Sequence, residues 1–409
     1  MSMPARSGND AEGAPTQVHF LAQLPPPIHG VTVVSKRVFG LMRAAPGVTV
    51  EHLWSGGAAS MGDIGTKSVG KLLQFAKLLT RLAWRAASGR RAHLAYLTLT
   101  PWSHAALRDG LLARVAGLGA DRVLVHLHTE GLAQVLADKG MRATALRWLL
   151  KGSELIAIVD ETARAAETSG VFARVNRLPN TVADPGLQPQ DSSAMPAGSD
   201  ADKALHCAYL GNYDTRKGIY EFIAMVGALR AQGHKIHGHI AGGETRFVSL
   251  TDLTNAAQSA GIAEHITLHG FVDEAAKSAL LRRCPVFVYP TRHDHAPLVL
   301  LEAMAHGCVP VTLDAGGIRS MMGEALCANV GDHTASADET RDWLVARVSA
   351  YARNPADLAA DRRAARQRYQ DHFGQDVFND RLQAILALQP VHVRTARKPL
   401  FTATHRVSP

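Results

Sequence analysis

The sequence predicts an α/β protein made of two Rossmann-like domains. Short runs of apolar and β-branched residues alternate with segments of helical periodicity in both halves of the chain, which is typical of parallel, doubly wound sheets. Residues 183–203, between the halves, are rich in Pro, Gly, Ser and Asp and therefore predict a linker. With 409 residues, of which 46% are hydrophobic, the chain is long enough for two domains.

Apolar runs bounded by turn residues predict the strands. In the first half they lie near 18–24, 48–54, 92–99, 122–128, 154–159 and 172–178. In the second half they lie near 205–210, 236–241, 265–268, 286–289 and 309–313. A terminal amphipathic helix is expected within 373–388, where apolar residues recur at helical spacing: Val377, Phe378, Leu382, Ile385 and Leu386.

These elements divide the chain into segments. A disordered tail covers 1–16, the N-terminal domain 17–182, the linker 183–203, the C-terminal domain 204–372, a terminal helix 373–390 and a basic tail 391–409. We expect the basic tail to be mobile, because it holds cationic residues and no acidic residue.

Composition favours a soluble cytoplasmic protein with reduced thiols. No apolar run reaches the roughly 18 residues of a membrane-spanning helix, and the segment 1–17 is too polar for a signal peptide. The four cysteines lie among apolar residues without CxxC spacing, which favours reduced core thiols over disulfides or zinc ligands: Cys207, Cys284, Cys308 and Cys327. The 20 histidines form no metal-ligand pattern either.

Positive charge is concentrated in the first half. Residues 1–185 hold 21 Lys and Arg against 13 Asp and Glu, a net +8, whereas residues 186–409 hold 23 of each. A basic half suggests an anionic partner. The charge alone does not distinguish between a membrane surface, a phosphorylated acceptor and nucleic acid. A solubilising surface without a partner explains the same numbers.

The segment 69–87 predicts an amphipathic helix with a basic face. At about 100° per residue, one face holds Leu72, Phe75, Ala76, Leu79, Leu82 and Ala83. Another face holds Lys71, Lys77, Arg81 and Arg85. Such a helix can lie on anionic lipid, or it can pack its apolar stripe against the sheet and leave the basic face exposed. Packing is the better explanation of the stripe.

The stretch from Tyr289 to Gly317 places one acid in a loop and a second inside the following helix. Pro297 is expected as the first helical residue, and Asp294 precedes it in the loop. Glu302 then lies about 7–8 Å along the helix from Pro297, close to the separation of a diphosphate from the ribose of one nucleotide. The free amides of the first turn suit anionic oxygens, and Glu302 suits vicinal hydroxyls.

Three further turns follow strands of the second domain. Arg216 and Lys217 lie in a GNYDTRKG segment that enters a helix, where their cations suit the oxygens of a diphosphate. Gly242 and Gly243 let backbone approach a ligand closely. Val272 follows the next strand of this domain. A later pair, Gly316-Gly317, is equally explained by a tight turn.

Two loops of the first domain are candidates for contact with the same ligand. His29 and Gly30 end a proline-stiffened loop before a helix, where Gly30 can bring amides close to a phosphate. His126 and His128 end the fourth strand and share one face, with His128 nearer the strand's carboxyl end. A lone histidine in such a place is usually structural.

The spacing of Asp294 and Glu302, with PLVLLEAMAHG around Glu302, resembles the donor-site signature of the family 4 retaining glycosyltransferases, which have the GT-B fold. The resemblance implies donor-binding roles for His29, Gly30, Gly242, Gly243, Val272 and Glu302, and for the loop and helix start His295, Ala296, Pro297 and Leu298. It also implies a catalytic set of Arg216, Lys217, His128 and Asp294. The usual residues at the first two motif positions are Glu and a small residue, whereas this chain has Asp294 and His295.

The resemblance implies transfer of a sugar from a nucleotide diphosphate to an acceptor hydroxyl, with a closing helix that returns to the N-terminal domain. No metal or other cofactor is expected. Metal-using glycosyltransferases of the other common fold carry an Asp-x-Asp triplet, and the one such triplet here, Asp200 to Asp202, lies in the linker. Expected partners are the nucleotide-sugar donor and a glycan or lipid-linked acceptor bound by the N-terminal domain. An anionic membrane surface is a further candidate, and nucleic acid is not expected.

Three alternatives stay open. A GT-B epimerase would convert the donor without an acceptor, and a phosphorylase would usually need a pyridoxal-binding lysine, which the sequence does not identify. A non-catalytic sugar-nucleotide sensor would explain the departures at Asp294 and His295. A dinucleotide oxidoreductase is disfavoured, because no GxGxxG follows an opening strand.

Overall fold

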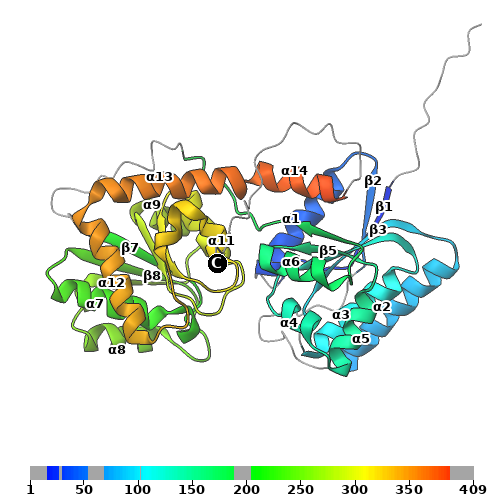
Figure 1. The fold of residues 1–409 in the computed structure, drawn as a ribbon, viewed down its shortest axis with the longest axis horizontal. Coiled ribbons are helices and arrows are strands. Elements are labelled where there is room, and N and C mark those ends of the chain that lie inside the picture. The colour runs from blue at the N-terminus through cyan, green and yellow to red at the C-terminus, as the bar shows by residue number, and fades with distance from the viewer. Residues whose placement is uncertain (1–15, 27–29, 54–68, 102, 188–203, 387–409) are drawn as a thin grey trace, which may run out of the picture.

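The computed structural model describes residues 16–26, 30–53, 69–101, 103–187 and 204–386 (Figure 1). The predictions for His29, for both tails and for the linker after residue 187 therefore lie outside the described residues. The N-terminal sheet has six parallel strands in the order β2-β1-β3-β4-β5-β6. Their bounds are β1 Thr16–Phe20, β2 Val48–His52, β3 Ala92–Leu99, β4 Ala120–Leu127, β5 Glu154–Ala157 and β6 Arg174–Arg177.

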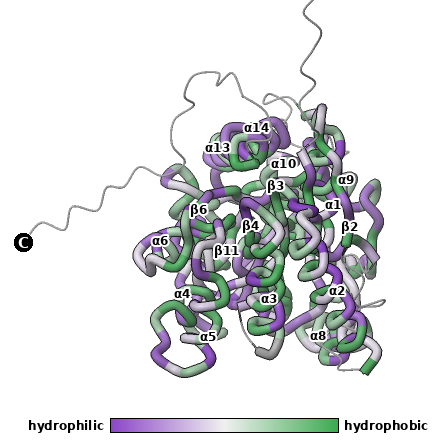
Figure 2. The backbone as a smooth tube through the Cα atoms, turned by 90° about the vertical axis from the view of Figure 1, so that its right-hand side faces the viewer, coloured by the Kyte–Doolittle hydropathy of each residue, from purple (hydrophilic) through white to green (hydrophobic). Residues whose placement is uncertain are grey.

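Helices cover both faces of this sheet. The apolar residues of α1 (Gly30–Ala44) and α14 (Gln375–Leu386) share one core cluster with Val18, Phe20 and Tyr96. Those of α2 (Val69–Ala87), α3 (Ser103–Ala116) and α5 (Met141–Leu150) form a second cluster on the opposite face. Figures 1 and 2 show these two groups of helices on opposite sides of the strands. The helices α4 (Leu132–Ala137) and α6 (Asp160–Ser169) also join the second cluster.

The C-terminal sheet repeats the architecture with the strand order β12-β11-β10-β7-β8-β9, again all parallel. Its strands are β7 Leu205–Leu210, β8 Ile236–Ala241, β9 Ile266–Gly270, β10 Val286–Tyr289, β11 Val309–Leu313 and β12 Val330–Gly331. Its helices are α7 Ile219–Ala231, α8 Leu250–Ser259, α9 Glu274–Arg283, α10 Leu298–Ala305, α11 Ile318–Met322, α12 Ala337–Arg353 and α13 Pro355–His372. The prediction of two parallel α/β sheets is confirmed.

The chain passes between the domains twice, and the two crossings touch. Thr181 donates a hydrogen bond through its hydroxyl to the carbonyl of Phe373, 2.6 Å away. Next to this contact, the Tyr369 hydroxyl donates to the carbonyl of Val182 at 2.9 Å. The second crossing leads into α14, where Arg122 of β4 donates to the carbonyls of Leu386 and Ile385. The last helix is thus fastened to the N-terminal domain by side-chain packing and by hydrogen bonds.

Two expectations from the sequence need correction. Cys207, Cys284 and Cys308 are buried, and burial raises the pKa of Cys207 to about 12, but Cys327 is exposed rather than in the core. The helix α2 has the predicted bounds, but its apolar stripe is divided: the structure buries Leu78 and Leu82 and leaves Leu72 exposed. No described helix is long and apolar enough to cross a membrane.

Candidate active site

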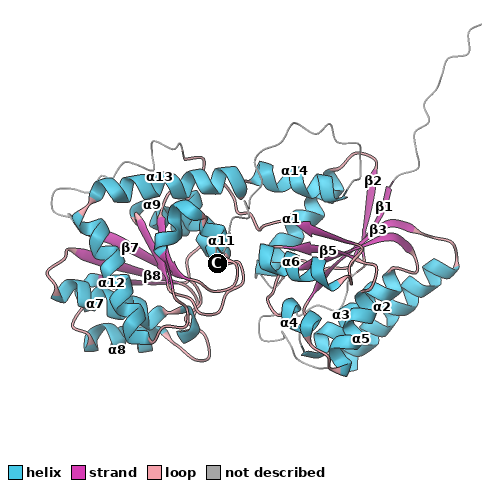
Figure 3. Cartoon of the chain, viewed as in Figure 1, coloured by secondary structure: helices cyan, strands magenta, loops and turns pink. Residues whose placement is uncertain are grey.

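The loops that leave the carboxyl ends of the C-terminal strands gather on the side facing the N-terminal domain (Figure 3). The central segment runs from β10 through the loop 290–297 into α10. Pro297 has an extended backbone, with φ −67° and ψ 126°, and caps the helix instead of beginning it, so the helix starts at Leu298. The Cβ position of Gly30, at the start of α1, lies 3.9 Å from the Leu298 side chain. Two helix N-termini, one from each domain, therefore lie close together, which favours bound anions.

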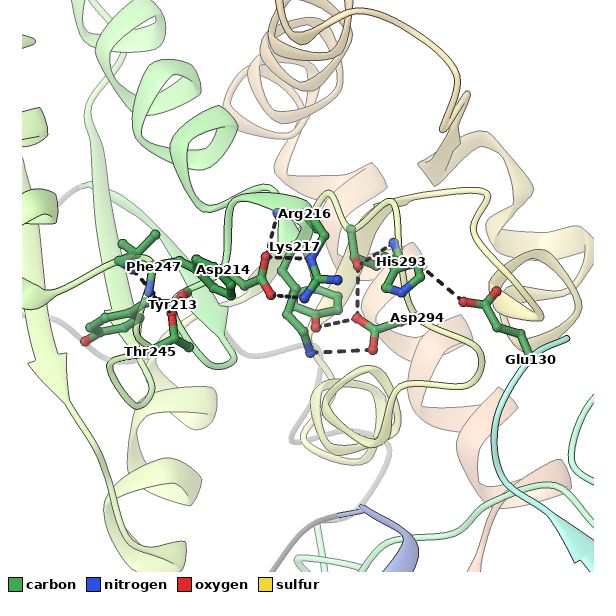
Figure 4. A network of polar contacts seen from close by, with 12 residues as sticks. Glu130, Tyr213, Asp214, Arg216, Lys217, Thr245, Phe247, His293 and Asp294 are labelled. Atoms are coloured by element: carbon green, nitrogen blue, oxygen red, sulfur yellow. Dashed lines mark hydrogen bonds and ion pairs between the residues drawn. The ribbon is translucent and has the colours of Figure 1, made fainter. Parts of the chain in front are cut away.

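Asp294 is held by three side-chain donors (Figure 4). Its Oδ2 accepts from the Tyr289 hydroxyl at 2.7 Å and from the Thr291 hydroxyl at 2.9 Å. Its Oδ1 lies 3.5 Å from the Lys217 ammonium. Burial, followed by the Asp294 carboxylate, raises the pKa of Tyr289, so this phenol remains a hydrogen-bond donor. The structure thus brings together two residues, 77 positions apart, that the sequence predicted for one site.

Arg216 and Lys217 lie in a short 3-10 turn, Thr215–Lys217, which precedes α7. Asp214 caps this turn and binds the Arg216 guanidinium, with its Oδ2 2.6 Å from Nη2. The hydrogen bond from Arg216 lowers the pKa of Asp214, and the Arg216 side chain is still 60% exposed. The segment enters α7 as predicted, but through this separate turn, because Gly218 ends the turn before α7 begins.

Backbone packing fixes the position of this turn against β10. Gly218 has φ 76°, and a Cβ there would lie 2.3 Å from the carbonyl oxygen of Pro290. The Arg292 amide donates to the carbonyl of Arg216 at 2.9 Å. Only glycine suits this conformation and this contact, so Gly218 permits the approach that places Lys217 beside Asp294.

Glu302 is paired with a lysine that the sequence analysis did not identify. Lys277 of α9 donates to Glu302 Oε1 at 2.7 Å, and the two side chains are only 17% and 18% exposed. Burial acts to lower the pKa of Lys277, but the carboxylates of Glu302 and Glu274 raise it overall. The contact holds the Glu302 carboxylate in one orientation, and one oxygen is left to accept from a ligand hydroxyl.

Close backbone packing requires glycine in the turn after β8. A Cβ on Gly242 would lie 1.9 Å from the carbonyl oxygen of Gly211, and the Gly242 amide donates to the carbonyl of Gly270. The three strand exits β7, β8 and β9 are thereby packed together, and the donor-binding role expected for Gly242 stays a prediction. Gly243 is less crowded, with Asn212 Oδ1 3.5 Å from its Cβ position. Val272 follows β9 and is partly buried against the domain core.

Two histidine rings lie side by side in the N-terminal domain, His126 in β4 and His128 just after it. The rings of His126 and His128 lie 3.9 Å apart, and the Tyr96 hydroxyl is 2.7 Å from His126 Nδ1. His126 is fully buried, and desolvation followed by the neighbouring His128 lowers its pKa well below the usual value. His126 is therefore neutral at the carboxyl end of β4, and His128 is the more exposed of the two.

His295 and Asn180 bring neutral polar atoms to the place where the domains meet. Asn180 is buried and donates through Nδ2 to the carbonyl of Ala296 at 3.1 Å. Among the described residues, neither ring nitrogen of His295 nor Asn180 Oδ1 has a hydrogen-bond partner. Burial lowers the pKa of His295 to about 4, so its imidazole is neutral at pH 7. Buried polar atoms without partners are costly, and a polar ligand would satisfy them.

The second glycine pair fastens this loop to the N-terminal domain. The Gly317 amide donates to the carbonyl of His295 at 2.7 Å. A Cβ on Gly316 would lie 2.5 Å from the carbonyl oxygen of Asp294, and one on Gly317 would lie 2.2 Å from Val159 Cγ1. Nearby, His293 Nδ1 lies 3.4 Å from Glu130 Oε1, a contact between the domains (Figure 4). The glycine pair therefore allows close interdomain packing, beyond the tight turn that the sequence suggested.

The family comparison concerns the domain that contains most of these residues. Residues 196–355 match the family model of the glycosyl transferases group 1. The match covers most of the C-terminal domain and less than half of the chain. Over 167 residues the chain is 31% identical to glycogen synthase of Mycobacterium tuberculosis, an alignment that covers 40% of this chain and 38% of that protein. The chain therefore matches less than half the length of this relative.

Solved structures resemble both domains together. The galactosyltransferase WaaB of the lipopolysaccharide outer core aligns with a TM-score of 0.64 and 13% identity over 91% of this chain and 99% of WaaB. Sucrose-phosphate synthase of Thermosynechococcus elongatus aligns with a TM-score of 0.64 and 15% identity over 90% and 98%. Anabaena HepE in complex with UDP and glucose aligns with a TM-score of 0.62 and 14% identity over 91% and 99%. The two domains of this chain thus have the GT-B fold.

Sequence reasoning missed Lys277, Asn180 and Val159. Lys277 lies on a helix whose sequence shows only ordinary charged residues, and Asn180 follows β6 in a short LPN segment. Their importance comes from packing between elements far apart in the chain, and no local pattern encodes it. Among the described residues, no group of three or more His, Cys, Asp or Glu side chains is arranged to hold a metal ion.

Proposed function

We propose that the protein is a family 4 retaining glycosyltransferase that moves a sugar from a nucleotide-diphosphate sugar to an acceptor hydroxyl. The observation that carries the proposal is the cluster of Arg216, Lys217 and Asp294 beside the N-terminus of α10. Two cations and the α10 amides suit a leaving diphosphate, and Glu302 follows one helical turn further on, where ribose hydroxyls would lie. The complex of HepE with UDP and glucose, a neighbour of the same fold, supports this ligand class.

The proposed chemistry is electrostatic. Arg216, Lys217 and the helix amides stabilise the charge that develops on the diphosphate as the glycosidic bond breaks, and the departing phosphate accepts the proton of the acceptor hydroxyl. His128 and Asp294 contact the donor sugar, and no metal is required. Retention is tested by the anomeric configuration of the first product in an NMR time course. Activity abolished by EDTA and restored by Mn²⁺ would contradict metal independence.

The proposed acceptor is a glycan or a lipid-linked glycan in polysaccharide, capsule or similar biosynthesis, bound by the N-terminal domain. The net +8 of residues 1–185 supports an anionic acceptor or a peripheral position at the cytoplasmic face of a membrane. Nucleic acid is not part of the proposal.

A thermal-shift screen with UDP, GDP, ADP and their sugars tests donor binding, because a ligand of the native state raises the melting temperature. Wild type and Glu302→Ala are compared, and an equal response of both would place the ribose elsewhere. Donor turnover is then followed with and without acceptor. Conversion of the donor to an isomer without acceptor would indicate an epimerase, and binding without any turnover would indicate a sugar-nucleotide-binding protein.

A further inference from the structure

The outer face of α2 is apolar and has no partner within the described part of the chain. At about 100° per residue, the side of α2 opposite its packed residues holds Val69, Leu72, Leu73, Ala76 and Trp84. All five side chains are exposed, Leu72 by 67%. The helix buries Leu78 and Leu82 against the sheet instead. An amphipathic helix of a soluble domain normally has polar residues on its outer side, so this face requires an explanation.

The apolar surface continues onto the neighbouring helices. The helix α3 packs beside both α2 and α5, and the three lie together on one side of the N-terminal sheet (Figures 1 and 2). Leu111 of α3, Leu118 just after it, and Met141 and Trp148 of α5 are all exposed. Among the described residues, eight of the twelve exposed large hydrophobic side chains belong to these three helices or to the turn after α3, and we call the outer surface of these helices the α2–α3–α5 face. Such a concentration marks an interaction surface.

The same face is strongly basic. Residues 69–91 contain six Lys and Arg and no acid, and residues 139–151 contain four and no acid. Each exposed tryptophan of this face lies beside an arginine. Arg90 lies 5.3 Å from the ring centroid of Trp84, and Arg114 of α3 lies 5.1 Å from that of Trp148. Near these helices, Glu51 is paired with Arg81 and Arg85, Asp121 with Arg91, and Asp109 of α3 with Arg108. The surplus charge is therefore positive.

We infer that the α2–α3–α5 face binds an anionic phospholipid surface, with the apolar side chains of α2 at the level of the acyl-chain boundary. Tryptophan beside arginine suits the headgroup region, where one part of each side chain is apolar and the other polar. Basic residues near the membrane add affinity for anionic lipid. A second copy of the chain would place two basic faces against each other, which charge repulsion opposes. This inference identifies the contact surface and does not depend on the proposed donor chemistry.

Vesicle flotation of the full chain tests the inference. The probes are vesicles of phosphatidylcholine alone and of phosphatidylcholine with roughly 30% phosphatidylglycerol. Wild type is expected to float with the anionic vesicles at about 50 mM salt and to be released at about 500 mM. The double variant Leu72→Ser/Leu73→Ser should lose at least about tenfold in bound fraction, and Lys77→Glu/Arg90→Glu should lose as much.

Controls separate this surface from folding and from the donor site. Phe247→Ser/Leu250→Ser removes two exposed hydrophobic side chains of the C-terminal domain and should float like wild type. The α2 variants should keep the melting temperature and the thermal shift with nucleotide. Three outcomes would overturn the inference: no flotation at low salt, flotation equal on neutral vesicles, or a dimer in sedimentation that the α2 variants abolish.

Discussion

The charged and the neutral parts of the candidate site differ in how their polar atoms are satisfied. On the C-terminal side, each charge is paired: Asp214 with Arg216, Lys217 with Asp294, and Lys277 with Glu302. Where the domains meet, His295 and Asn180 Oδ1 are buried without hydrogen-bond partners among the described residues. The protein itself therefore holds the charged groups in position, whereas a ligand would complete the neutral ones.

The largest effect is expected at Lys217. If its ammonium stabilises the leaving diphosphate, Lys217→Met should lower kcat by about 10²–10³-fold with little change in melting temperature. If Lys217 only holds Asp294, the loss should be matched by Asp294→Asn, and the double variant should be no worse than either single variant. A double-mutant cycle in kcat, measured with the donor identified by thermal shift, decides between these roles.

Asp214→Asn tests the same question for the neighbouring cation. This variant removes the carboxylate that orients the Arg216 guanidinium but retains the positive charge of Arg216. We expect a smaller loss of kcat than for Arg216→Ala. An equal loss would mean that the orientation of the guanidinium, more than its charge, supports turnover.

The next largest effect is expected on nucleotide binding. Glu302→Gln should weaken binding of the nucleoside diphosphate about ten- to a hundredfold, because hydrogen bonds to a charged group contribute about 1.5–3 kcal/mol. Lys277→Met should weaken it less, through loss of the orientation of Glu302. Isothermal titration calorimetry measures both values.

Glu274→Gln is the matched control for this pair. Glu274 binds the same ammonium as Glu302, but its side chain is 91% exposed and it lies on α9 instead of α10. Affinity should stay at the wild-type value in this variant. A loss equal to that of Glu302→Gln would show that the net charge around Lys277, and not a contact from Glu302, controls binding.

Local patterns were sufficient for the fold and for locating Arg216, Lys217, Asp294 and Glu302 near strand ends of one domain. The bounds of β3, β7, β8, β10 and β11 follow directly from apolar runs, whereas β12 has only two residues and leaves no such pattern. For α2, periodicity predicted the helix ends but not the packed face, since apolar residues cover most of its circumference. Lys277 and Asn180 could not be found because each contact depends on how distant elements pack.

Histidines whose pKa is lowered by burial should make stability fall at acidic pH. Burial lowers the pKa of His239 to about 3 and of His295 to about 4, while unfolded histidine has a pKa near 6.5. At a pH between its folded and its unfolded pKa, each of these two histidines binds a proton only in the unfolded state. Their contribution is present above about pH 6.5 and is lost, by about 1.4 kcal/mol per pH unit for each histidine, as the pH falls below it.

His239 offers the cleanest measurement, because it lies outside the candidate active site. Its ring nitrogens lie within hydrogen-bond distance of His206, at 2.9 Å, and of His269, at 3.1 Å. Burial is the largest cause of its lowered pKa, and electrostatic interactions with His237 and Arg283 act in the same direction. In urea unfolding between pH 6.5 and 5, His239→Gln should have a slope of stability against pH that is smaller by about one proton. An unchanged slope would mean that His239 takes up its proton in the folded state.

The smallest effect, and the most specific, is expected at His295. Replacement by Gly restores the small residue usual at this motif position and removes two ring nitrogens that have no partner among the described residues. If the imidazole contacts the donor sugar, His295→Gly should change the ratio of kcat/KM between two sugars on the same nucleotide by several-fold while leaving the affinity for the bare nucleotide unchanged. Asn180→Ala, which removes the nearby amide, should shift the same ratio. Equal losses for every sugar would instead assign His295 to the packing of the Gly316-Gly317 turn, because that turn binds the His295 carbonyl. The test therefore separates recognition by the side chain from support by the backbone at one position.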